Sequence, residues 1–145
     1  MITVSRQALV GYGAAEMYAL VEDVESYPRF LPWCSAAEVV LREPARTVAT
    51  IHIDFRGVRQ QFTTENVNRP GERIAIRLMR GPFKSLDGEW RFIQLGEAGC
   101  RIDFDLAYQL ASPVLERLVG PVFNQIATSF VDAFVRRADA LHLRS

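Results

Sequence analysis

Residues 112–143 read SPVLERLVGPVFNQIATSFVDAFVRRADALHL, and their pattern decides the fold. The stretch predicts one long amphipathic helix, because Ser112 suits the N-cap and Pro113 the first helical position, where a missing N–H costs nothing. Apolar residues recur at spacings of three, four or near multiples, which makes one wide apolar stripe. The stripe comprises Leu115, Val119, Val122, Ile126, Phe130, Phe134 and Leu141. Because Pro121 cannot donate to the carbonyl four residues back, we expect a kink or a break there.

A helix this long needs a large apolar surface to lie on, and the rest of the chain predicts strands that supply it. Residues 2–9 form a first predicted strand, followed by a helix over 14–24 and a short helix that Pro28 opens and Pro32 closes. From residue 37 onward apolar and polar residues alternate, which is typical of strands. These predicted strands cover 37–41, 47–55, 58–67, 73–79, 86–92 and 100–110. Short turns between them imply a curved seven-stranded antiparallel sheet with helices on one side, an α+β architecture.

Length and composition predict one soluble domain spanning 1–145. Cys34 and Cys100 have no metal or redox spacing, so we expect reduced thiols in a reducing compartment. The opening MITVSRQ lacks the basic and then apolar pattern of a signal peptide, and no apolar run approaches the roughly 18 residues of a membrane span. These features predict a cytoplasmic protein.

The net charge is zero, but the charges are unevenly distributed. Basic residues crowd the segment 56–84, whereas acidic residues crowd 16–25. One interpretation is a set of solvated strand faces opposite an acidic helix. The other is a basic face that meets anionic lipid or RNA. The predicted surface basic patch comprises Arg59, Arg73, Arg77, Arg80 and Lys84.

Motifs for catalysis and metal binding are missing from the sequence. The two histidines, His52 and His142, belong to no metal-ligand pattern, and no nucleophile elbow, phosphate loop or dinucleotide fingerprint occurs. Asp103 and Asp105 share one face of a strand, and alternation turns them outward to solvent rather than into a paired acid–base site. We therefore expect a protein that is not an enzyme, with no metal and no required cofactor.

One long helix cannot fully cover a strongly curved seven-stranded sheet. The expected result is a cavity between sheet and helix, lined by aromatic residues. The alternative is that Trp90, Phe92, Phe104 and the helix phenylalanines fill the core solid. Periodicity alone leaves both alternatives open.

Three stretches together resemble the coenzyme Q-binding START-domain family, which also contains the bacterial ribosome-association toxins. They are YALVEDVESYPRFLPWC at 18–34, GPFKSLDGEWRF at 81–92 and FNQIATSFVDAFVRRA at 123–138. The resemblance covers nearly the whole chain. It implies the helix-grip (START/Bet v 1-like) fold, in which the sheet grips a long C-terminal helix over an apolar cavity.

The resemblance implies two functions of different classes. The interpretation we favour from the sequence is a ubiquinone-binding protein that supports ubiquinone synthesis, its delivery and respiratory electron transport, with peripheral contact to the cytoplasmic membrane. The alternative is a toxin that binds the large ribosomal subunit and blocks subunit joining. A cyclase-like enzyme remains a further alternative by analogy of fold alone.

Ubiquinone or a similar isoprenoid quinone would need an apolar tunnel with a few polar groups for the quinone head. The predicted lining residues are Phe30, Trp33, Phe55, Phe62, Ile76, Leu78, Phe83, Leu86, Trp90, Phe104, Tyr108, Val119, Phe123 and Ile126. Tyr108, Gln60 and Trp33 are the predicted hydrogen-bonding groups for the quinone oxygens.

Overall fold

The structure is a computed structural model, and it describes residues 1–143. The strands of this part of the chain are β1 (Ile2–Val10), β2 (Cys34–Glu43), β3 (Arg46–Phe55), β4 (Val58–Arg69), β5 (Arg73–Arg80), β6 (Phe83–Leu95) and β7 (Gly99–Leu110). The helices are α1 (Ala14–Glu22), the 3-10 helix η1 (Val24–Arg29) and α2 (Pro113–Leu143). The predicted order of elements is confirmed.

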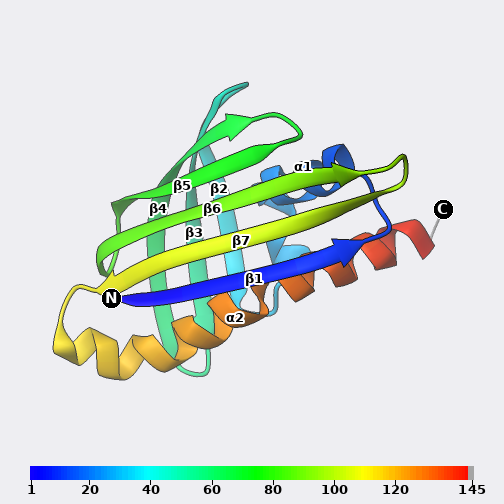
Figure 1. Ribbon diagram of the computed structural model, residues 1–145. Coiled ribbons are helices and arrows are strands. Elements are labelled where there is room, and N and C mark those ends of the chain that lie inside the picture. Colours follow the sequence, from blue (N-terminus) through cyan, green and yellow to red (C-terminus); the bar gives the residue numbers. More distant parts are fainter. Residues whose placement is uncertain (144–145) are drawn as a thin grey trace.

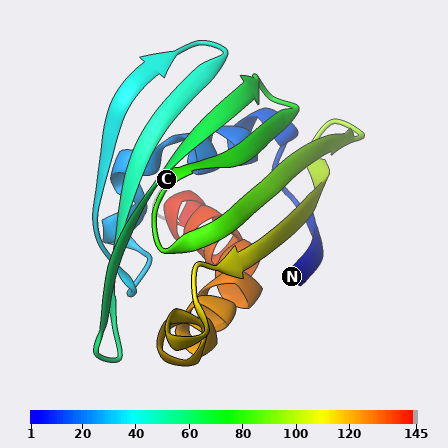
Figure 2. The same cartoon turned by 90° about the vertical axis from the view of Figure 1, so that its left-hand side faces the viewer.

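The strands form one antiparallel sheet in the order β1-β7-β6-β5-β4-β3-β2. The first strand pairs with the last, from Ile2 opposite Tyr108 to Val10 opposite Cys100. The sheet curls around α2, which lies in its concave side (Figures 1 and 2). This arrangement confirms the predicted α+β helix-grip fold.

Helix α2 begins as the sequence predicts but continues where a break was expected. The backbone N–H of Leu115 donates to the Ser112 hydroxyl at 3.2 Å, which is the predicted cap. The helix runs unbroken through Pro121. The carbonyl that loses its partner belongs to Arg117, and both residues are exposed, so water can replace the missing hydrogen bond.

The inner face of α2 differs in detail from the predicted stripe. Its buried side chains are Val119, Phe123, Ile126, Ala127, Val131, Phe134 and Ala138. Leu115, Val122 and Phe130 are half-buried, and Leu141 is exposed. By length and apolar composition the segment Pro113–His142 would suit a membrane span, but its buried side chains pack on the sheet, as in the core helix of a globular domain.

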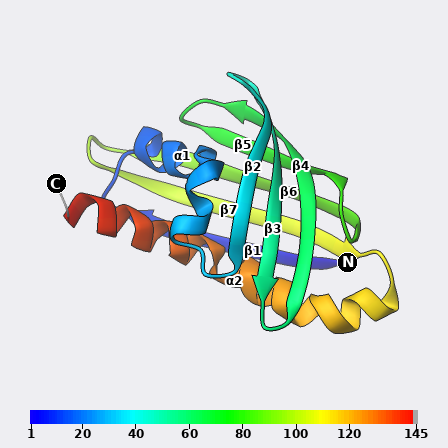
Figure 3. The same ribbon diagram turned by 180° about the vertical axis from the view of Figure 1, so that it is seen from behind.

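The segment between β1 and β2 forms two short helices that lie over the sheet. Figure 3 shows α1 and η1 on the same side of the sheet as α2, with η1 beside β2. The predicted helix over 14–24 ends at Glu22, and η1 follows with Pro28 inside it. The Tyr27 hydroxyl of η1 donates to the carbonyl of Val21 at 2.5 Å, which joins the two segments.

Strand β2 is longer than the predicted strand over 37–41. Its register against β3 shifts between Cys34 and Ala36 and again between Val39 and Leu41. Each irregularity changes which residues of the strand face the core. Strict alternation of apolar and polar residues therefore identifies only part of β2.

Candidate functional site

The concave side of the sheet encloses a cavity of about 80 Å³. Its walls come from α1, η1, strands β3 to β7 and α2. Close packing of tilted rings limits its size, because Phe130 lies 5.5 Å from Trp90, 5.7 Å from Phe104 and 5.9 Å from Trp33, measured between ring centroids. The core is therefore neither solid nor a wide tunnel. Pockets that hold drug-sized ligands measure roughly 300–1,000 Å³, so this cavity is several times smaller.

The predicted lining residues divide into two groups. Those that border the cavity are Trp33, Phe62, Ile76, Leu86, Trp90, Phe104, Phe123 and Ile126. Those that do not are Phe30, Phe55, Leu78, Phe83, Tyr108 and Val119. Two of the second group pack beside the lining residue Phe123, whose ring lies 4.8 Å from that of Phe83 and 4.7 Å from that of Tyr108. Alternation places such residues on the inner face, but only the packing of α2 decides which part of that face is covered.

Several lining residues were missing from the prediction. They are Val21, Val24, Tyr27, Ala49, Ile51, Thr64, Asn66, Ile74, Leu106, Ala127 and Phe130. The first three come from α1 and η1, whose position over the sheet follows from tertiary packing. Thr64 and Asn66 continue the inner face of Phe62 along β4, so alternation was the available signal and their polarity obscured it.

The cavity has few polar side chains, and those of Thr64, Asn66 and Tyr27 already have hydrogen-bond partners. The Thr64 hydroxyl donates to Oδ1 of Asn66 at 3.1 Å. Burial raises the pKa of the Tyr27 phenol, and its hydroxyl donates to a carbonyl at 2.5 Å. No lining residue within the described chain is an aspartate, glutamate, histidine, lysine, arginine or cysteine. Tyr27 is the lining residue with an ionisable side chain, and its hydroxyl is occupied by the carbonyl of Val21.

Two of the three predicted quinone-binding groups lie away from the cavity. Gln60 borders a shallow hollow on the surface beside His52 and Arg59. The Tyr108 hydroxyl is buried and accepts from Nδ2 of Asn124 at 3.4 Å, and burial raises its pKa. Only Trp33 borders the cavity.

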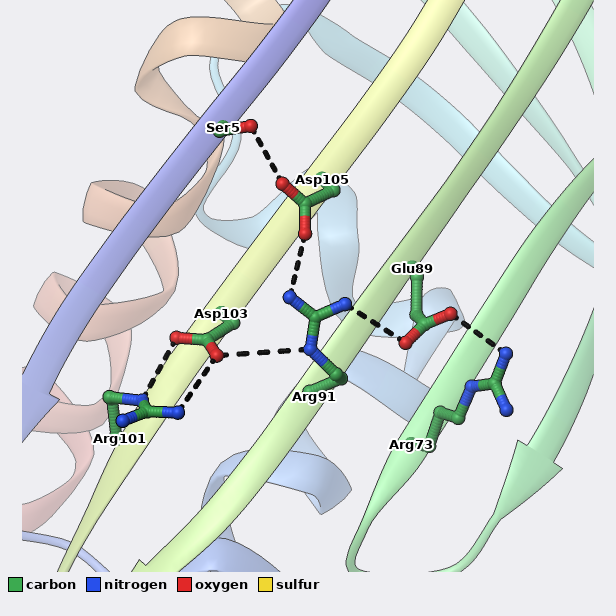
Figure 4. Close-up of polar contacts among 7 residues, drawn as sticks. All are labelled: Ser5, Arg73, Glu89, Arg91, Arg101, Asp103 and Asp105. Atoms are coloured by element: carbon green, nitrogen blue, oxygen red, sulfur yellow. Dashed lines mark hydrogen bonds and ion pairs between the residues drawn. The ribbon is translucent and has the colours of Figure 1, made fainter.

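A network of ion pairs covers the outer face of the sheet (Figure 4). Arg91 donates to Asp105 at 2.7 Å and to Glu89 at 3.0 Å, and Arg73 donates to Glu89 at 2.7 Å. The carboxylates of Asp105 and Glu89 raise the pKa of the Arg91 guanidinium. The hydroxyl of Ser5 and the guanidinium of Arg91 lower the pKa of Asp105.

Asp103 and Asp105 face outward as predicted, but they are not simply solvated. The side chain of Asp103 is 9% exposed and lies 3.2 Å from Arg101 and 3.8 Å from Arg91. The arginine side chains cover it from solvent. Both aspartates are therefore parts of a charge network rather than free acid–base groups.

The predicted basic patch is partly neutralised. Arg73 pairs with Glu89 at 2.7 Å, and Arg77 pairs with Glu65 at 2.8 Å. Glu65 also accepts from Arg46 at 2.7 Å, and the hydrogen bonds from Arg77 and Arg46 lower its pKa. Arg59 lies 3.4 Å from Asp54. Arg80 and Lys84 are exposed and form no ion pair within residues 1–143.

Comparison with known families places residues 10–135 in a family described as polyketide cyclase / dehydrase and lipid transport. The chain is 42% identical to the ribosome association toxin RatA of Pseudomonas aeruginosa, over 96% of both chains. It is 38% identical to the protein of the same name from Escherichia coli K12, over 98% of this chain and 90% of that protein.

A more distant relative is named for coenzyme Q binding, the other predicted function. The mitochondrial coenzyme Q-binding protein COQ10 homolog B of Xenopus laevis is 26% identical, over 99% of this chain and 60% of that protein. The prediction of a ubiquinone-binding protein is therefore wrong, because the relatives at 38–42% identity are named ribosome association toxins. The small cavity agrees with this correction on physical grounds.

Solved structures show the same fold. The Zhui aromatase/cyclase from Streptomyces superposes with a TM-score of 0.78 at 18% identity, over 95% of this chain and 93% of that one. A START superfamily protein from Mycobacterium smegmatis gives 0.78 at 21% identity, over 96% and 98%. At these identities the likeness establishes the architecture alone.

Proposed function

The chain belongs to the polyketide cyclase / dehydrase and lipid transport family, and within it we propose that this protein binds the large ribosomal subunit and blocks subunit joining. The observation that carries the proposal is its similarity, along nearly its whole length, to bacterial proteins named ribosome association toxins. Such a role belongs in the cytoplasm, as the sequence predicts.

The small size of the internal cavity supports a function that is performed by the surface of the protein. A cavity of about 80 Å³ is several times smaller than the roughly 300–1,000 Å³ of pockets for drug-sized ligands, too little for an isoprenoid quinone. Its polar groups, Thr64 and Asn66, are hydrogen-bonded to each other. The cavity is too small to carry such a cargo, so we assign the function to contacts that the surface of the protein makes.

The test is a subunit-joining experiment with the purified protein. Large and small ribosomal subunits are mixed at a magnesium concentration that favours joining, with increasing amounts of protein, and separated on a sucrose gradient. We expect the joined ribosome peak to fall and the protein to sediment with the large subunit. Subunits that join normally at excess protein, with the protein left at the top of the gradient, would overturn the proposal.

The order of addition gives a matched control. Protein that competes with the small subunit for the large one should act more strongly when it is added before joining than after. An equal effect in both orders would indicate dissociation of ribosomes rather than a block of their assembly.

A further inference from the structure

Carboxylates neutralise most arginines of the sheet, whereas the side chains of six exposed cations form no hydrogen bond, ion pair or ring contact within residues 1–143: Arg29, Arg69, Arg80, Lys84, Arg117 and Arg136. Three of the six, Arg80, Lys84 and Arg117, belong to segments at one end of the molecule. We propose that this end, around the β5–β6 turn and the start of α2, is the surface that contacts ribosomal RNA, with Arg80, Lys84 and Arg117 binding phosphates. The inference rests on the proposed function and names the surface that would perform it.

The outer face of the sheet is unsuited to phosphate. Each arginine that would turn to an RNA phosphate must leave a carboxylate 2.7–3.2 Å away, as for Arg73 with Glu89 and Arg101 with Asp103. The carboxylates left behind would repel the phosphate. The network of Figure 4 therefore presents almost no net charge to RNA.

The three cations at the end of the molecule have no such competition. Arg80, Lys84 and Arg117 are all exposed, and none of their side chains forms a hydrogen bond or ion pair within residues 1–143. Their charges are available to a partner at no cost in broken internal contacts. Neutralising phosphates with such side chains releases condensed counterions, which drives binding to RNA.

These three residues come from segments that are joined at the same end. Arg80 and Lys84 flank the β5–β6 turn, whose Pro82 carbonyl accepts from the N–H of Ala111 at 2.9 Å. Ala111 leads directly into α2, and Arg117 lies in its second turn. Figure 2 shows this end facing the viewer, with the β3–β4 hairpin beside it.

Three exposed apolar residues lie close to these three cations in sequence. Val114 and Leu118 are 62% and 63% exposed and stand one turn apart on α2, and Met79, next to Arg80, is 53% exposed. Cations beside apolar residues also suit an anionic membrane, but insertion there needs a much broader apolar face than three side chains. We therefore favour RNA, and the test includes vesicles.

The experiment compares two triple variants that lose equal charge. The end variant carries Arg80→Gln, Lys84→Gln and Arg117→Gln. The sheet variant carries Arg73→Gln, Arg77→Gln and Arg101→Gln, and it leaves each freed carboxylate a second arginine: Arg91 for Glu89 and Asp103, Arg46 for Glu65. Binding to purified large subunits is measured at several salt concentrations, with circular dichroism and thermal unfolding as checks of folding.

We expect the end variant to lose about tenfold or more in affinity and its plot of log affinity against log salt to become shallower by roughly 2 to 3. The sheet variant should bind like the wild type. Equal losses in both variants, or a loss without a change in salt slope, would overturn the assignment of phosphate contacts. A wild type that binds anionic phosphatidylglycerol vesicles but not subunits would overturn both the surface and the proposed function. Wild-type binding that neither variant weakens would overturn the surface alone.

Discussion

A Cβ atom at position 81 would lie 2.6 Å from the Cβ of Phe62, closer than two carbon atoms can approach. It would also lie 3.1 Å from the Cα of Phe62, so a rotation of the ring cannot relieve the contact. The β5–β6 turn passes against the backbone of β4 because residue 81 is glycine. This close packing of Gly81 on β4 fixes the position of the turn that Arg80 and Lys84 flank.

The first prediction is that Gly81→Ala destabilises the protein. The added methyl group forces the turn away from β4, and overpacking of this kind costs about 1–3 kcal/mol. Urea unfolding followed by circular dichroism measures the change. Gly11→Ala is the matched control, because a Cβ there meets nothing within 4 Å and we expect almost no loss. Equal stability of the two variants would contradict the contact.

The second prediction concerns Phe134, the buried ring at the centre of the aromatic core. Its side chain is 0% exposed and its ring centroid lies 5.2 Å from that of Phe30 and 5.4 Å from that of Trp90. Phe134→Ala removes these contacts and leaves a cavity, which costs about 3–5 kcal/mol. Leu118→Ala, on the exposed side of the same helix, should stay within about 0.5 kcal/mol. Thermal unfolding of both variants checks the contrast, and a small loss at Phe134 would show that the core re-forms around the gap.

The architecture was predictable because periodicity records which face of each element meets the core. Alternation from Cys100 to Leu110 identified β7, and the cap at Ser112 identified the start of α2. Where local geometry departs from the regular period, prediction fails. The bulges of β2 and the unbroken passage of α2 through Pro121 are the examples.

The candidate site was less predictable because it depends on contacts between residues that are far apart in the sequence. Which inner-face residues line the cavity depends on how the ring of Phe130 packs against those of Trp33 and Trp90. The pairing of Arg77 with Glu65 depends on strand register, which the sequence does not display. A cluster of basic residues in sequence therefore predicted a patch that the fold partly neutralises.

The third prediction is that both cysteines are unreactive in the folded protein. Cys34 and Cys100 are buried free thiols, and burial raises the pKa of Cys34 to about 11. Burial also raises the pKa of Cys100. Because only the thiolate reacts, an aromatic disulfide reagent at pH 8 should modify neither residue rapidly. Both should react after unfolding in urea, and a fast reaction of the native protein would show that one thiol is accessible.

The last prediction is a pH dependence of stability at Asp105. Its carboxylate accepts from Ser5 at 2.7 Å and from Arg91 at 2.7 Å, and these contacts lower its pKa in the folded state below the ordinary value of 3.8. The stabilisation is therefore complete above about pH 5 and is lost as the pH falls through the lowered folded pKa. Because the side chain is 46% exposed and screened by solvent, the contribution is less than about 1 kcal/mol.

Asp105→Asn should thus lower the free energy of unfolding at pH 7, and the difference from the wild type should shrink as the pH approaches 2. Urea is the suitable denaturant, since it adds no ionic screening. Asp87→Asn is the matched control, because Asp87 lies on the same outer face and forms no ion pair within residues 1–143. A difference at Asp105 that stays constant from pH 7 to pH 2 would mean that lost packing, and not the carboxylate's contacts with Ser5 and Arg91, causes the destabilisation.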